Sequence, residues 1–329
     1  MPEKRKKREV VLKRFLDESA ARARERRRLL REIEGEIPKF LTLGETASLL
    51  VVSYFVDYHC GYLDTSDAQM LEDLLQAASY PFNLFLIVDG PGGFGLAAEQ
   101  VINVCRTYGG GGFSVIVPKM AKSAASVICL GAERLILGPT AELGPIDPQI
   151  RQPDGSAISA ASYVERYKKL LDRAENTKGN IEPFLMGLKS FDPVMVEDLE
   201  REIELSRKVA EDALFSGMWK GQDRTKELTE KLKIFTQITE KGSHGRAILF
   251  PELQKALELQ QESHIQQISA HSELWGLLWE LYNRTRASLS DQSTKLIETR
   301  DESFPGPPAR EMYESTTKSG QTKDEATLR

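Results

Sequence analysis

Two short segments of this sequence combine residues that could polarise and attack a carbonyl group. The first, Asp89-Gly90-Pro91-Gly92-Gly93, follows an apolar run and precedes a helical pattern. Glycines let the backbone turn tightly and bring amide N–H groups close to a ligand, and a helix N-terminus adds positive potential. The second is the turn at Ser123, which again joins an apolar run to a helical pattern. A serine there is either a nucleophile or an N-cap for the helix, and its type and place leave both roles open.

The elements around these turns predict an α/β protein with a parallel sheet. Four apolar runs have the length and composition of strands buried on both faces: 48–55, 84–89, 113–117 and 134–137. Three helical patterns lie between them: 67–77, 96–108 and 124–132. Alternating strands and helices are typical of β-α-β units with right-handed crossovers. We therefore expect the two turns at corresponding ends of neighbouring strands.

Taken together, the two turns resemble those of the Clp protease and signal peptide peptidase A group. Gly90-Pro91-Gly92-Gly93 is followed one strand later by Lys122-Ser123-Ala124-Ala125. A third segment, Leu143-Gly144-Pro145-Ile146-Asp147-Pro148-Gln149, is similar to the hallmark run of the serine dehydrogenase proteinase family. The likeness is sharpest over 84–150 and weaker to about 298. It implies a Clp protease/crotonase-like core of repeated β-α-β units with an α-helical C-terminal part, and peptidase chemistry without nicotinamide.

The resemblance also implies roles for individual residues. Ser123 is the expected nucleophile, and the backbone amides of Gly93 and Ala124 are the expected oxyanion hole, with Gly92 permitting the close turn. An alignment to the Ala-Ala-Ser of the Clp proteases would select Ser126 instead. We prefer Ser123 because its spacing to the end of the helix matches that of signal peptide peptidases.

A serine alcohol needs a neighbouring base to become a useful nucleophile. No histidine lies between Ser123 and His244, so the triad of the Clp proteases is missing as written, and the resemblance to signal peptide peptidase A implies a Ser-Lys dyad. The candidate is Lys189, because its apolar neighbours favour partial burial and burial lowers the pKa of a lysine. Lysines in a charged helix are weaker candidates, and the one beside the serine is expected to point away: Lys168, Lys169 and Lys122. His244 is a base, a metal ligand or a structural residue of a turn.

Composition bounds the class of protein. The 329 residues carry a net charge of -5, which argues against general nucleic-acid binding by the whole chain. No run reaches the roughly 20 apolar residues of a membrane helix, and no apolar segment follows the basic N-terminus, so we expect a cytoplasmic protein. The 3 separated cysteines predict reduced thiols. Because no cluster has metal-ligand spacing, we expect neither a metal nor a cofactor.

The sequence divides into four parts. Residues 1–40 predict a charged helical arm, 41–160 the catalytic core, 161–302 a mostly helical part that completes the core, and 303–329 a disordered tail. The arm is expected to serve packing or assembly, with a membrane or another protein as its alternative partner. The helical part is expected to supply contacts in a homo-oligomer.

The leading hypothesis is a serine-type peptidase that cleaves a peptide or protein substrate through an acyl-enzyme on Ser123. Two alternatives keep the fold. A crotonase-like acyl-CoA enzyme would use the same oxyanion geometry, but such sites lack a nucleophilic serine. A binding or scaffold protein derived from a peptidase would account for the missing histidine.

Overall fold

The apolar runs form neighbouring parallel strands, as their composition predicts. The computed structural model describes residues 2–41, 48–78, 82–151, 157–236, 246–257 and 264–307. In this part of the chain a central sheet has the order β10-β5-β3-β2-β1-β11-β12. Its strands are β1 (Leu49–Val56), β2 (Asn83–Asp89), β3 (Ser114–Val117), β5 (Arg134–Leu137), β10 (Ile265–Gln267), β11 (Lys295–Glu298) and β12 (Ser303–Pro305). The strands from β10 to β1 run parallel, and β11 and β12 are added antiparallel.

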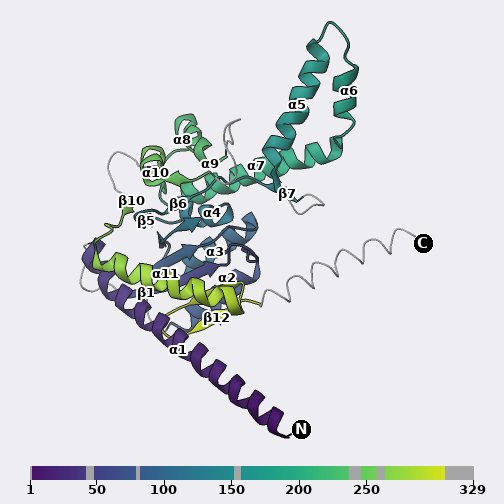
Figure 1. The fold of residues 1–329 in the computed structure, drawn as a ribbon. Helices are drawn as coiled ribbons and strands as arrows, with labels where there is room; N and C mark the ends of the chain where they lie inside the picture. The colour runs from purple at the N-terminus through teal and green to yellow at the C-terminus, as the bar shows by residue number, and fades with distance from the viewer. Residues whose placement is uncertain are drawn as a thin grey trace.

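Helices cover both faces of the sheet because its central strands are apolar on both sides (Figure 1). On one face lie α2 (Ser66–Gln76), α3 (Gly95–Tyr108), α4 (Ala124–Leu130) and the C-terminal end of α7 (Pro193–Ser216). On the other lie α1 (Pro2–Leu41) and α11 (Glu273–Gln292). Alternate side chains of one strand serve the two layers, so that Leu86 faces the first layer and Ile87 the second.

The N-terminal helix is only partly the exposed arm that the sequence predicts. Its second half buries Leu29, Leu30 and Ile33 completely in the layer shared with α11. Arg26 in that half is buried against Glu298 of β11, with Nε 2.7 Å from the carboxylate. The first half of α1 extends away from the body of the molecule (Figure 1). Leu29, Leu30 and Ile33 of the predicted arm are therefore part of the core.

The C-terminal part contributes strands that the sequence did not predict. The part expected to be mostly helical, 161–302, also contains strands: β10 lies between α10 (Phe250–Leu257) and α11 and runs parallel to β5. The expected tail is also wrong at its start, because β12 within it pairs with β11. Residues 308–329 lie outside the described part of the chain. Strands of three or four residues are too short to show a periodicity, which is why these were missed.

Smaller elements extend the fold beyond the carboxyl ends of the parallel strands. Three short strands form a second sheet in the order β4 (Met120–Ala121), β6 (Glu142–Leu143) and β9 (Ile248–Leu249), and β7 (Gln149–Arg151) pairs with β8 (Ala157–Ser159). The remaining helices are α5 (Ala160–Asn176), α6 (Glu182–Leu188), α8 (Lys226–Lys231) and α9 (Lys233–Thr236). A helical hairpin of α5, α6 and the start of α7 projects from the core (Figure 1). None of the described helices is both long and apolar enough to cross a membrane.

Candidate active site

Ser123 occupies a strained turn between β4 and α4. Its φ of 51° makes it the one residue other than glycine with a positive φ among those that the structure describes. Ser123 is partly exposed, whereas its neighbours from Ala121 to Ala132 are all buried. Its side chain makes no capping hydrogen bond to α4. The N-cap role that the sequence left open is thus not used, and the hydroxyl is presented to the surface on a turn of unusual geometry.

The glycine-rich turn after β2 lies directly against the Ser123 turn. A Cβ atom placed on Gly92 would come within 2.5 Å of the Lys122 carbonyl oxygen and 2.6 Å of the Ser123 Cβ. Gly92 has a φ of 102°, which a side chain would also strain. Only glycine allows this approach. The two turns that the sequence placed at neighbouring strand ends are therefore in contact.

The Gly93 amide is oriented by its own peptide unit. The Gly92 carbonyl accepts a hydrogen bond from the Leu63 N–H at 2.8 Å. The C=O and N–H of a trans peptide point in opposite directions, so the Gly93 N–H points away from Leu63. Among the turn and loop hydrogen bonds of the described residues, this amide has no backbone acceptor. It is a fixed donor that is open to a ligand.

The Ala124 amide is oriented in the same way. The Ser123 carbonyl accepts hydrogen bonds from Ser126 N at 2.9 Å and Val127 N at 3.3 Å, inside the first turn of α4. The Ala124 N–H of that peptide unit therefore points out of the helix, as the first amides of a helix do. Gly93 and Ala124, which belong to the two turns in contact, thus each carry an N–H that points away from the hydrogen-bonded carbonyl of its own peptide unit.

Ser126, the competing serine, is completely buried. Its Oγ lies 2.8 Å from the Ala121 carbonyl oxygen and 3.0 Å from that of Gly144, and it accepts from Gly144 N at 3.1 Å. The hydroxyl thereby fastens the Gly144-Pro145 segment to α4. Its burial gives it a structural role and leaves Ser123 as the accessible hydroxyl of the pair.

The loop that carries Leu63 is held by a buried ion cluster. Lys295 Nζ of β11 lies 2.7 Å from Asp64 Oδ2 and 2.6 Å from Asp67 Oδ1, and both Lys295 and Asp67 are completely buried. The Tyr54 hydroxyl donates to Asp67 at 2.5 Å, and burial next to this carboxylate raises the pKa of Tyr54. Leu63 precedes Asp64, so the cluster fixes the segment that orients the Gly92–Gly93 peptide.

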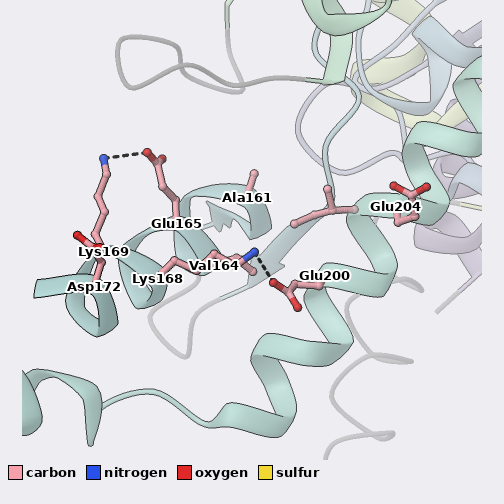
Figure 2. A pocket seen from close by; sticks show the side chains of 9 residues that line it. Ala161, Val164, Glu165, Lys168, Lys169, Asp172, Glu200 and Glu204 are labelled. Carbon is pink, nitrogen blue, oxygen red and sulfur yellow. Dashed lines mark ion pairs between the residues drawn. The ribbon is translucent and has the colours of Figure 1, made fainter. Parts of the chain in front are cut away.

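The lysines proposed as bases lie elsewhere. Lys189 ends α6 in the projecting hairpin and is exposed, so the partial burial expected from its apolar neighbours is wrong; those neighbours belong to the hairpin itself (Figure 1). An open hollow of about 620 Å³ lies along α5 and α7, and Figure 2 shows the side chains that line it. There Lys168 pairs with Glu200 at 2.5 Å and Lys169 with Glu165 at 2.8 Å.

Lys122, beside the serine, is buried and engaged by other groups. Its Nζ lies 2.7 Å from Glu142 Oε1 and donates to the carbonyls of Leu143 at 3.1 Å and Arg246 at 3.3 Å. The lysine thus ties the Ser123 turn to β6. His244 lies outside the described residues.

The strain at Ser123 predicts that glycine there would stabilise the protein. A residue with a side chain in such a conformation costs on the order of 1–3 kcal/mol, and glycine returns roughly 0.5–1 kcal/mol of this as extra entropy of the unfolded chain. We expect Ser123→Gly to raise the free energy of unfolding by about 1 kcal/mol. Urea denaturation of both proteins measures this. A less stable glycine variant would show that the turn is unstrained.

Sequence reasoning missed the residues that hold the two turns together. Asp89 ends β2, is completely buried, and accepts from the Met120 N–H at 2.9 Å. Burial raises its pKa to about 6. Tyr58 and Arg286, from the loop after β1 and from α11, lie against it. A charged residue at the end of an apolar run was the available signal for Asp89, whereas nothing in the sequence connected Tyr58 or Arg286 with it.

Comparisons with known proteins found similar sequences and a solved structure. Two uncharacterized proteins of Methanocaldococcus jannaschii are similar: MJ1495, 30% identical over 102 residues, and MJ0137, 32% identical over 134 residues. The matches cover 31% and 39% of this chain and only 35% and 46% of those proteins. A solved structure of a ClpP1 mutant from Listeria monocytogenes also aligns with this chain. The alignment covers 68% of this chain and 94% of the ClpP1 chain, with 13% sequence identity and a TM-score of 0.35.

The family model for ClpP-like SDH-type serine proteinases matches residues 18–179, which include both turns and the sheet strands from β1 to β5. This is the family that the Gly-Pro-Gly-Gly turn, the Ser123 turn and the run from Leu143 to Gln149 resemble in the sequence. Residues 18–179 of this chain are thus similar to the ClpP-like SDH-type serine proteinases.

Proposed function

We propose that this protein is a serine-type peptidase with Ser123 as nucleophile and the amides of Gly93 and Ala124 as oxyanion hole. The observation that carries the proposal is the contact between Gly92 and the Ser123 turn. It brings an accessible hydroxyl beside two backbone donors whose own peptide carbonyls are already engaged. The family match supports the reaction class.

The chemistry follows from this arrangement. Ser123 Oγ attacks the carbonyl carbon of a peptide bond while a base takes the hydroxyl proton. The tetrahedral oxyanion accepts hydrogen bonds from the two amides, each worth about 2.7–4 kcal/mol in comparable sites. The C–N bond then breaks, the proton passes to the leaving amine, and water hydrolyses the acyl-enzyme to release the acid and the free serine.

The general base that takes the proton of the Ser123 hydroxyl is to be identified by experiment. Lys189 is exposed at the end of α6, so the single chain does not give it the burial that the Ser-Lys dyad was expected to use. This exposure favours the second candidate function, a binding protein that keeps the peptidase fold without turnover. His244 is the residue to replace in a search for the base, because it is the histidine that follows Ser123 first in the sequence.

Labelling with a fluorophosphonate separates the candidate functions. For a peptidase we expect the purified full chain to form one adduct, located on Ser123 by mass spectrometry, and to cleave peptides from a mixed library. A crotonase-like enzyme would be stabilised against heat by acyl-CoA and leave peptides intact. A chain that takes up no label and cleaves no peptide would contradict the proposal and favour the binding protein.

A further inference from the structure

The carboxylate of Asp89 links the two turns of the candidate site. Its Oδ2 accepts from the Met120 N–H at 2.9 Å, three residues before Ser123. The Met120 carbonyl in turn accepts from Gly90 N at 2.8 Å, and the Gly90 carbonyl accepts from Lys122 N at 3.1 Å. The backbone before Ser123 is thus bonded at three successive points to the end of β2. Asp89 supplies the one contact of the three that depends on a side chain.

Two side chains hold Asp89, and a third lies against one of them. The Tyr58 hydroxyl donates to its Oδ1 at 2.5 Å. The Arg286 guanidinium lies over the Tyr58 ring, 3.4 Å from the ring centre, with one nitrogen 3.7 Å from Asp89. The same guanidinium donates to the Val56 carbonyl at 2.7 Å, at the end of β1. The Tyr282 hydroxyl lies 3.5 Å from that of Tyr58. A carboxylate buried at this depth is kept in one rotamer by these partners.

We propose that Asp89 is a positioning residue: it fixes the Met120 backbone against β2 and so sets the distance between Ser123 and the Gly93 amide. The proposal rests on the proposed function of that site. An error of about 1 Å in such a spacing can slow a reaction roughly a hundredfold. Burial raises the pKa of Asp89 to about 6, which reflects the free-energy cost of keeping a carboxylate there. A role beyond packing accounts for its presence at such a position.

Three variants of the full chain test the role. Asp89→Ala removes both acceptors, Asp89→Asn keeps one oxygen for the Met120 N–H, and Asp57→Ala is the matched control. Asp57 is also a buried carboxylate near Arg286, at 3.9 Å, but its bonds go to the amides of His59 and Cys60. We expect fluorophosphonate labelling to slow roughly a hundredfold in Asp89→Ala and to recover to within about tenfold of wild type in Asp89→Asn. For Asp57→Ala we expect a rate near that of wild type.

Two further readouts separate positioning from general destabilisation. For peptide hydrolysis, kcat should fall in Asp89→Ala while KM stays unchanged. Hydrogen exchange should accelerate over 119–124 in this variant and not in Asp57→Ala. Labelling of folded Asp89→Ala at the wild-type rate, or equal slowing by Asp57→Ala, would overturn the proposal. If Asp89→Ala does not fold, the test rests on Asp89→Asn. The positioning role would be overturned if Asp89→Asn labels at the wild-type rate and also exchanges hydrogen over 119–124 at the wild-type rate.

Failure of the proposed function gives a different pattern. If wild type neither labels nor cleaves, the peptidase is refuted, yet exchange over 119–124 still reports whether Asp89 holds Met120. Unchanged exchange in Asp89→Ala would refute the positioning role with or without catalysis. The two hypotheses therefore fail in separate measurements.

The pH dependence of the free energy of unfolding tests whether the Asp89 carboxylate is buried. Tyr58 and Arg286 face the carboxylate, Tyr282 lies against the Tyr58 hydroxyl, and Asp57 lies near Arg286. Because its pKa of about 6 in the folded protein exceeds the ordinary value of 3.8 for an aspartate, the folded state binds the proton more tightly. Its contribution to stability is present below pH 3.8 and is lost as the pH rises through about 6. The unfolding free energy of wild type relative to Asp89→Asn should fall over this window; a flat difference would contradict the buried network.

Discussion

Ser123→Ala is expected to abolish both fluorophosphonate labelling and peptide cleavage while leaving the protein folded. The variant removes the hydroxyl that we propose as nucleophile, and this hydroxyl makes no cap bond whose loss would unfold α4. Loss of a serine nucleophile lowers kcat by roughly a millionfold in comparable enzymes. Mass spectrometry of the labelled protein and hydrolysis rates measure the effect.

Ser126→Ala is the matched control, because it removes the same oxygen three residues later. Ser126 is buried and bonded to Ala121 and Gly144, so its loss should lower the free energy of unfolding by about 1–3 kcal/mol. Labelling of the folded variant should persist at Ser123. If instead Ser123→Ala still labels and Ser126→Ala does not, the assignment of the nucleophile is wrong.

Lys295→Met should produce the largest loss of stability of any variant considered. The substitution keeps the length of the side chain but leaves Asp67 as a completely buried carboxylate without its ammonium partner. Breaking a buried pair in this way costs about 3–5 kcal/mol. Because Asp64 also loses its bond to Lys295, the loop that carries Leu63 should loosen and Ser123 should label more slowly. Urea denaturation and labelling kinetics measure both effects.

A second ion pair, with nearly the same separation between its nitrogen and oxygen atoms, serves as the control for Lys295 and Asp67. Lys168 lies 2.5 Å from Glu200, with side chains 63% and 41% exposed, whereas Lys295 lies 2.6 Å from Asp67 with both at 0%. Lys168→Met should therefore change the unfolding free energy by only about 0–1 kcal/mol. Adding Asp67→Asn to Lys295→Met should restore part of the lost stability, since no uncompensated charge remains. Equal losses for the two lysines would show that burial does not control these pairs.

The strands that carry the candidate site were predictable because each is a continuous apolar run bounded by turn residues. Runs such as 84–89 and 113–117 can be placed between helical layers from composition alone. The outer strands were not predictable. Leu296 and Ile297 of β11 form too short a run to mark a strand, and it pairs with β1 from more than two hundred residues away. Pairing over such distances depends on the chain returning to the sheet, which local pattern does not encode.

The sequence by itself determined the two turns, their glycines and the serine, because positive φ and strand-to-helix junctions leave local signatures in residue type. Only the tertiary structure decided which serine is accessible: Ser123 and Ser126 differ in burial, which depends on Gly144 packing against α4. Only the tertiary structure, likewise, showed Lys189 to be exposed and brought Arg286 to Asp89. Burial and charge pairing arise from residues far apart in the chain, and the physical chemistry of a side chain follows from those neighbours rather than from its place in the sequence.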